Sequence, residues 1–137
     1  MAHAFGAPEW AASLRDTING SSEYRNAAAQ WGVGFDGSLL LVFEPDPGLD
    51  RPLRLRLGLA GGTCQSAEFV GEDAPSAAFT LRGPFVVWRS ILERKTLAAT
   101  AILTGKLRVE GDTMALLRHT AASRALIHCV ASVDTAW

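Results

Sequence analysis

The chain has 137 residues, and its 13 Lys and Arg residues against 14 Asp and Glu give a formal net charge of −1 at pH 7. This length predicts a single domain over residues 1–137, large enough to bury a sizeable core. A charge so close to zero gives no electrostatic basis for binding nucleic acid. No apolar run is long enough to cross a membrane, so stable membrane insertion is not expected.

The N-terminal residues lack a basic region followed by an apolar core, so the sequence predicts no signal peptide. Cys64 and Cys129 form no close-spaced motif. Two free thiols in a reducing compartment are therefore favoured, and the expected location is cytoplasmic. Arginine outnumbers lysine and alanine is abundant, a bias that favours a bacterial source with a GC-rich genome.

The N-terminal third is expected to be helical. Residues 1–7 are predicted to fray. Pro8 suits the first turn of a helix that runs to about Ile18, where Asn19-Gly20 stops it. Ser21 or Ser22 can start a second helix that continues through Trp31.

The middle of the chain has the pattern of an antiparallel sheet. A strand is predicted over residues 38–44, with apolar residues on both faces, followed by a loop at 45–48. Residues 53–59 alternate between leucine and mostly arginine, which indicates a sheet covered on one side only. Gly61-Gly62 supplies a hairpin turn to a partner strand at 63–70, and a fourth strand is expected at 77–82.

Two apolar helices should follow the break at Gly83-Pro84. The first, over residues 84–94, has apolar residues at helical spacing, and the second spans 96–104. A fifth strand at 106–110 and C-terminal helices complete the chain. The predicted fold is therefore α/β (α+β in finer terms): a five-stranded, mostly antiparallel twisted sheet with helices packed on one face.

The segment from Gly105 to Asp112 is predicted to be structural rather than catalytic. Gly105 can close a helix in the left-handed conformation, and Lys106 to Glu110 alternate as a short strand with Leu107 on one face. Gly111 frees the next turn, and Asp112 can cap the following helix.

This Gly-Lys-Leu-x-x-x-Gly-Asp segment resembles the signature of the sterol carrier protein type 2 family. The similarity is clearest from Pro84 to Val133. At the N-terminus, the pattern Trp10…Ile18-Asn19…Tyr24-Arg25…Ala28…Trp31 resembles small stand-alone prokaryotic members. The resemblance implies an apolar tunnel between sheet and helices, no enzymatic activity and no cofactor. The chain departs from eukaryotic members at residues 135–137, where their peroxisomal tripeptide is missing.

Apolar residues of the predicted helices are candidates for lining such a tunnel. Periodicity alone favours an ordinary core, and the resemblance makes a ligand cavity comparably plausible. The candidates are Phe85, Trp88, Ile91, Leu92, Ile102, Leu103, Met114, Leu117, Leu126, Ile127 and Val130.

Three other motifs are weaker. Residues 32–37 fit G-x-G-x-x-G, but they follow a predicted helix and open a strand, the reverse of a dinucleotide-binding turn. Glu44, Asp46 and Asp50 lack EF-hand spacing, so a turn is favoured over a calcium loop. The three histidines are scattered, and no metal site is predicted.

The sequence thus favours non-enzymatic binding or transfer of a lipid or other hydrophobic molecule, such as a fatty acyl, isoprenoid or sterol-like compound. An accessory domain that presents an apolar substrate to a partner protein, or simply binds one, is the alternative. A homodimer or a partner enzyme is compatible with either hypothesis. An enzyme with a spatially assembled site is a third hypothesis, although no nucleophile motif is visible.

Overall fold

The core of the protein is a five-stranded sheet in a computed structural model that describes residues 2–137. The strands lie in the order β4-β3-β2-β5-β6. β2 and β5 are parallel and the other neighbours are antiparallel, which confirms the mostly antiparallel sheet. Their bounds are β2 Leu39–Glu44, β3 Leu53–Ala60, β4 Thr63–Val70, β5 Phe79–Pro84 and β6 Arg108–Glu110.

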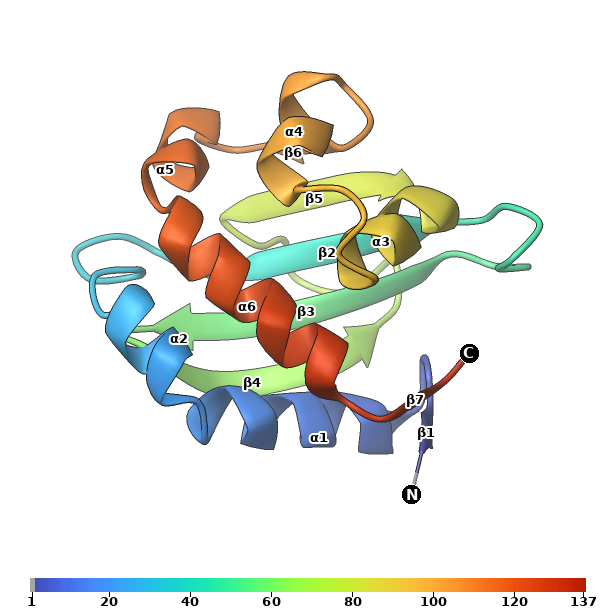
Figure 1. Ribbon diagram of the computed structural model, residues 1–137, viewed down its shortest axis with the longest axis horizontal. Helices are drawn as coiled ribbons and strands as arrows, with labels where there is room; N and C mark the ends of the chain where they lie inside the picture. The colour runs from blue at the N-terminus through green and yellow to red at the C-terminus, as the bar shows by residue number, and fades with distance from the viewer. Residues whose placement is uncertain (1) are drawn as a thin grey trace.

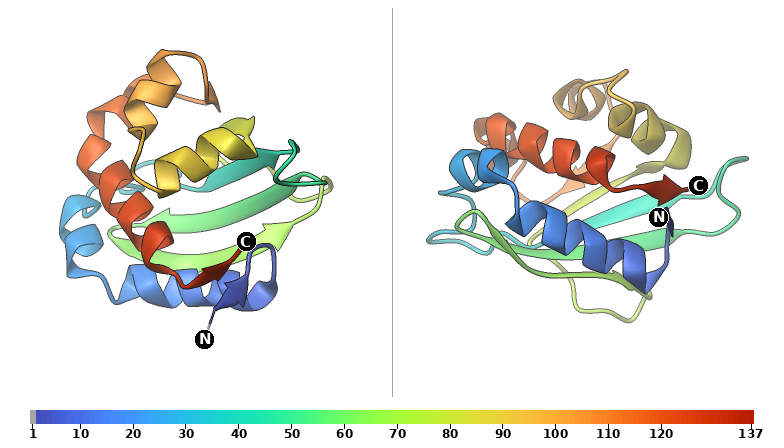
Figure 2. Two further views of the ribbon diagram at one scale, coloured as in Figure 1. Left: turned by 45° about the vertical axis from the view of Figure 1, so that its right-hand side comes forward. Right: turned by 60° about the horizontal axis from the view of Figure 1, so that its bottom comes forward.

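Six helices accompany the sheet within the described residues. They are α1 Pro8–Asn19, α2 Ser22–Ala27, α3 Phe85–Leu92, α4 Ala98–Leu103, α5 Thr113–Arg118 and α6 Thr120–Ser132. α6 passes across the sheet, α1 runs along β4 at one edge, and α4 and α5 lie separately toward the opposite edge (Figures 1 and 2). No helix in residues 2–137 combines the length and the apolar character needed to cross a membrane.

The two faces of the sheet differ as the alternation in β3 predicts. Leu55 and Leu57 are fully buried beneath the helices. Arg54 and Arg56 point to the opposite face, because successive side chains of a strand alternate in direction. Ion pairs lie on this open face, including one between Arg82 and Glu110 on neighbouring strands. Only one face of the sheet therefore needs helices to cover it.

The expectation that residues 1–7 fray is wrong for residues 3–5, while Met1 lies outside the described residues. β1 (His3–Ala4) pairs in parallel with β7 (Thr135–Ala136). Phe5 then enters a cluster of aromatic rings, with Trp10 and Phe43 each at 5.0 Å between centroids. Burial of this ring stabilises a segment whose short sequence has no periodicity.

The second helix is shorter than predicted. Its first turn is capped as expected, since the Ser21 hydroxyl accepts a hydrogen bond from the Tyr24 N–H at 3.0 Å. The helix ends at Ala27 rather than Trp31. The Trp31 carbonyl instead accepts a hydrogen bond from the Gly61 N–H at the β3–β4 turn, at 2.8 Å. A tertiary contact therefore replaces the last helical turn.

The segment from Gly105 to Asp112 has the predicted structural role. Gly105 has a φ angle of +77°. Its N–H donates to the Ile102 carbonyl, and the Lys106 N–H donates to the Ala101 carbonyl. These bonds form the Schellman motif that closes α4. The Asp112 carboxylate accepts from the Ala115 N–H at 3.2 Å and so caps α5.

Gly111 and Gly105 offer a matched test of this interpretation. Both have positive φ, but an added Cβ at Gly111 would lie 2.7 Å from the Ala78 carbonyl oxygen, whereas at Gly105 it would meet nothing within 4 Å. We expect Gly105→Ala to lower the free energy of unfolding by about 1 kcal/mol. Gly111→Ala should cost about 2 kcal/mol or more, because a steric clash adds to the backbone strain. Urea unfolding midpoints that are equal for the two variants would contradict this.

Both cysteines are free and buried. Burial raises the pKa of the Cys64 thiol to about 11. Burial also raises the pKa of the nearby Tyr24 hydroxyl well above its ordinary value, and the two groups interact electrostatically. The folded state therefore holds both groups in their neutral forms.

These shifts predict a loss of stability at alkaline pH. The Cys64 thiol ionises at a lower pH in the unfolded chain than in the folded protein. Its contribution to the free energy of unfolding is therefore fully present below about pH 9, the ordinary pKa of a thiol. The free energy of unfolding should fall as pH rises through about 11. Urea titrations of wild type and Cys64→Ala across this range should show a shallower decline in the variant. Parallel curves would show that the thiol does not contribute.

Candidate binding site

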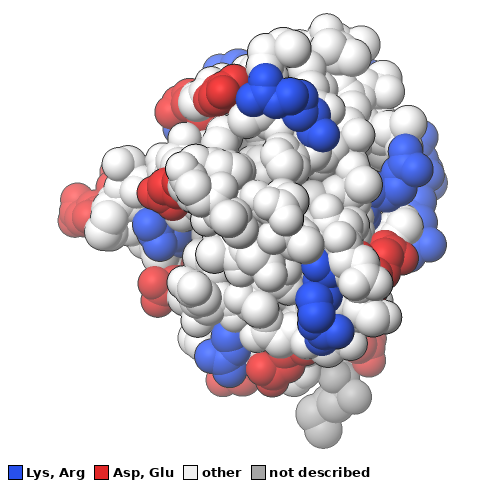
Figure 3. Space-filling view, turned by 90° about the vertical axis from the view of Figure 1, so that its left-hand side faces the viewer, with Lys and Arg blue, Asp and Glu red and all other residues white. Residues whose placement is uncertain are grey.

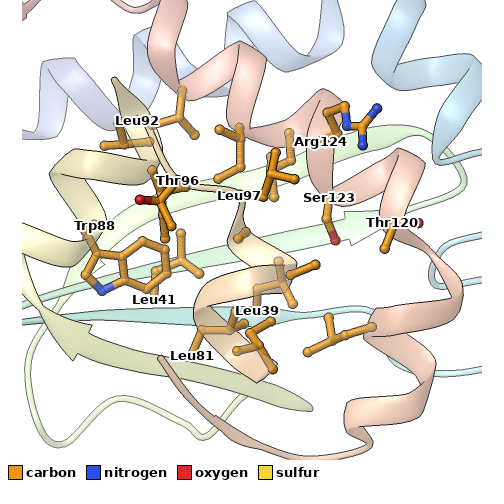
Figure 4. A pocket seen from close by; sticks show the side chains of 18 of the residues that line it. Leu39, Leu41, Leu81, Trp88, Leu92, Thr96, Leu97, Thr120, Ser123 and Arg124 are labelled. Atoms are coloured by element: carbon orange, nitrogen blue, oxygen red, sulfur yellow. The ribbon is translucent and has the colours of Figure 1, made fainter. Parts of the chain in front are cut away.

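A pocket of about 210 Å³ lies between the sheet and the helices α3, α4 and α6. Its floor is a row of leucines on three adjacent strands, in which Leu41 of β2 lies directly opposite Leu55 of β3 and Leu81 of β5. Leu39 extends this floor along β2 (Figure 4). The floor follows from the strand period of two, which places alternate residues of β2 on the covered face.

Helix α3 forms one wall of the pocket and is fixed to the sheet by hydrogen bonds. The Trp88 indole N–H donates to the Val42 carbonyl at 2.9 Å, and the ring lies 5.0 Å from that of Phe43. The carboxylate of Asp46, in the loop after β2, accepts from the Val86 N–H in the first turn of α3 at 2.7 Å. These bonds set the position of the α3 side chains that face the pocket.

The opposite wall comes from α4, α5 and α6. Ile102 of α4 and Leu117 of α5 lie at the pocket, and α6 contributes several side chains along one face. α6 is thirteen residues long, so its helical periodicity presents a continuous apolar stripe to the sheet. The apolar residues of α6 at the pocket are Leu126, Ile127 and Val130.

Polar side chains gather at the margin of the pocket. Thr120, Ser123 and Arg124 lie on the α6 side, away from Trp88 (Figure 4). His128, one turn further along α6, has its Nδ1 2.8 Å from the Glu23 carboxylate. Most of the lining is therefore apolar, with polar side chains at the α6 side and with Thr96 beside Trp88 (Figure 4).

Eight of the eleven candidate residues from the helices line this pocket. They are Trp88, Ile91, Leu92, Ile102, Leu117, Leu126, Ile127 and Val130. Their binding of a ligand stays a prediction.

Phe85, Leu103 and Met114, the other three candidates, do not line this pocket. Phe85 is buried in the aromatic cluster with Phe5 and Trp137 instead. Leu103 and Met114 are 72% and 59% exposed. α4 and α5 have six residues each, too few for apolar spacing to identify the buried face.

Sequence reasoning missed the leucine floor and the polar margin. The alternation of β2 and β3 could have identified floor residues such as Leu41 and Leu55, because it already marked the covered face. Ser123, Arg124 and His128 carried no comparable signal, since a polar residue near a helix start is usually solvated.

The weaker motifs have structural explanations. Residues 32–37 lie between α2 and β2, without the strand-then-helix context of a dinucleotide site. The carboxylate of Asp46 caps α3, and Glu44 forms an ion pair with Arg108. No cluster of three potential metal ligands occurs in residues 2–137.

Comparison with known proteins connects this architecture to one family. The model of the SCP-2 sterol transfer family matches residues 44–122, more than half of the chain. The chain is also similar to a sterol carrier protein 2 of known crystal structure, with 29% sequence identity and a TM-score of 0.81. The match covers 94% of this chain and 98% of that one. No curated protein sequence gives a significant match.

Two further structures have the same fold. A conserved hypothetical protein of Thermus thermophilus, described as possibly a sterol carrier protein, is 27% identical with a TM-score of 0.81, over 99% of this chain and 94% of that one. The apo form of sterol carrier protein 2 from Yarrowia lipolytica is 16% identical with a TM-score of 0.56, over 88% of each chain. The last similarity concerns the fold alone.

Trp88 and Trp31 form a matched pair for testing the pocket. Each donates its indole N–H to a buried carbonyl at 2.9 Å, but only Trp88 lines the pocket. Changing either one to Phe leaves a buried carbonyl without its donor, so both variants should lose about 1–3 kcal/mol in urea unfolding. Only Trp88→Phe should change the affinity for an apolar ligand in calorimetric titrations. A similar change of ligand affinity in Trp31→Phe would show that the effect of Trp88→Phe does not arise from its position in the pocket.

Proposed function

Because the chain belongs to the SCP-2 sterol transfer family, we propose that its pocket binds a lipid or similar hydrophobic molecule and carries it through water. The observation that supports this most directly is an apolar pocket between sheet and helices, floored by leucines from three strands. A filled core would have favoured the alternative of an accessory domain that needs no ligand. Binding to a second copy of the chain, to form a homodimer, or to a partner enzyme is compatible with the carrier function and stays a prediction.

The volume of the pocket favours a slender ligand. A cavity of about 150 Å³ holds one benzene ring. A pocket of about 210 Å³ is therefore suited to part of an acyl or isoprenoid chain and is small for four fused sterol rings. We infer that a single flexible chain is the ligand.

The hydrophobic effect supplies the driving force for this binding. Burying about 300 Å² of apolar ligand surface contributes roughly 7 kcal/mol at ~25 cal/mol per Å², before the cost of association. Such binding requires no positioned nucleophile, acid or base. We therefore propose that the protein acts without chemical catalysis.

The distribution of polar groups suggests how the ligand is oriented. The chain would lie over the leucine floor toward Trp88. A polar or anionic group at its end would lie beside Ser123 and Arg124, where a guanidinium and a hydroxyl can donate hydrogen bonds.

Ligand identification is the direct experiment. Organic-solvent extraction of the purified protein should release a single-chain lipid, and a fluorescent fatty-acid analogue should bind saturably and be displaced by unlabelled fatty acid. A fatty acid should bind more tightly than the alcohol of equal chain length, because only the acid pairs with Arg124. An absence of saturable binding across fatty acids, acyl esters, phospholipids and sterols would refute the carrier function.

Filling the pocket should abolish this binding while the protein stays folded. Ala99 lines the pocket at α4, whereas Ala121 is an exposed alanine of α6 outside it. Ala99→Phe places a ring in space that the ligand needs and should weaken fatty-acid affinity at least tenfold, equivalent to about 1.4 kcal/mol. Ala121→Phe, with the same change in size, should bind like wild type. Calorimetry on both variants, with circular dichroism as the folding control, provides the measurement.

A further inference from the structure

A second cavity, of about 500 Å³, lies at the C-terminal ends of α3 and α6. It is lined by Leu92, Glu93, Trp137 and residues 130–135. The end of α3 lies against α6 there, and the C-terminal segment of the chain runs alongside (Figure 2, left). Glu93, Asp134 and Trp137 are exposed, so the second cavity is open to solvent.

The second cavity and the leucine-floored pocket share two residues. Leu92 of α3 and Val130 of α6 line both of them. Both side chains are buried, and the two helices that carry them pack against each other. The two aliphatic side chains therefore form a partition between the pocket and the second cavity. Neither side chain has a hydrogen bond that a passing lipid chain would have to break.

The polar groups of the second cavity are hydrogen-bond acceptors. Ionised carboxylates such as those of Glu93 and Asp134 can only accept. The Ser132 hydroxyl donates to the Cys129 carbonyl at 2.8 Å, so its oxygen acts toward a ligand as an acceptor. α3 ends at Leu92 and α6 at Ser132, and the last carbonyls of a helix lack intrahelical N–H partners and bear partial negative charge. The second cavity therefore favours a ligand group that donates a hydrogen bond.

The charged residues of the pocket have the opposite sign. Arg94 and Arg124 line the pocket, and within residues 2–137 no Asp or Glu does. Two carboxylates line the second cavity, and no Lys or Arg of the same residues does. Glu93 pairs with Arg89 and Lys95, which lie outside that lining. Figure 3 shows the side formed by α2, α5 and the start of α6, where basic side chains border a broad uncharged area.

We propose that the second cavity is a further subsite for the ligand, which receives the far end of a long lipid chain that carries a hydroxyl group there. The anionic end of such a chain lies beside Arg124. Its methylene groups cross the leucine floor and pass between Leu92 and Val130. Its hydroxyl group donates to the acceptors at the end of α6. The inference deepens the proposed carrier function and rests on it, because the chain must occupy the pocket to reach the second cavity.

A comparison of end groups at two chain lengths tests this in the wild-type protein. ω-Hydroxyoctanoic acid should bind about tenfold or more weakly than octanoic acid, because a hydroxyl that ends in the apolar pocket loses its hydrogen bonds to water. ω-Hydroxyhexadecanoic acid should bind at least as tightly as hexadecanoic acid. Hexadecanedioic acid should bind several-fold more weakly than either long acid, because its second carboxylate meets Glu93 and Asp134.

Displacement of a fluorescent fatty-acid analogue gives these affinities. A hydroxyl group that weakens binding equally at both chain lengths would overturn the proposal, because both chain ends would then lie in the same apolar surroundings. The comparison needs no substitution, so it decides the question even where a variant fails to fold.

Filling the second cavity tests its position. Ala131 lines the second cavity and not the pocket, whereas Ala121 of α6 lines neither. Ala131→Phe should lower the affinity for ω-hydroxyhexadecanoic acid about tenfold or more and leave that for octanoic acid unchanged. Ala121→Phe should bind both acids like wild type. Ala99→Phe, inside the pocket, should weaken the binding of both acids.

Octanoic acid separates a failure of this proposal from a failure of the carrier function. Octanoic-acid binding in all folded variants except Ala99→Phe, with loss of the long acid in Ala131→Phe, supports the second subsite. Equal affinity of Ala131→Phe and wild type for the long acid, or parallel loss of both acids in Ala131→Phe, would refute it while the carrier function stands. A wild-type protein that binds no acid of either length would refute both.

Discussion

The apolar row formed by Leu55, Leu41 and Leu81 is the constraint on which the rest of the structure depends. Strand alternation places these side chains on one face of the sheet, and water must be excluded from that face. The opposite face carries the arginines of β3 and two ion pairs across the strands, Arg82 with Glu110 and Arg108 with Glu44, and has no helix over it. All helical packing is therefore directed to one side, and the candidate site can lie only there.

The helices cover this face without filling it, and hydrogen bonds explain why the space persists. The Trp88 indole is bonded to the Val42 carbonyl, and Asp46 holds the first turn of α3. Both bonds would be lost if α3 moved inward to close the gap, leaving buried polar groups without partners. α4 is held at its end by the Schellman motif at Gly105 and buries only Ala101, so it adds little bulk above the floor.

The sequence predicted the features that depend on repeated local patterns. The alternation of β3, the β3–β4 hairpin and the cap at Asp112 each involve several residues that favour one conformation. The pairing of β1 with β7 could not be predicted, because two-residue strands have no period and their partners are distant in sequence. The length of α6 defines an apolar stripe, which places Leu126, Ile127 and Val130 at the pocket. Leu103 and Met114 are exposed, and their helices complete fewer than two turns, too few to define a face.

The parallel pairing of β2 with β5 has a consequence for the order in which the protein is made. β3 and β4 are synthesised between these two neighbours, so the leucine floor is incomplete until residues 79–84 have emerged from the ribosome. Its main cover, α6, follows only at residues 120–132. The pairing of β2 with β5 and the packing of α6 are therefore contacts between distant parts of the chain, the kind that slows folding.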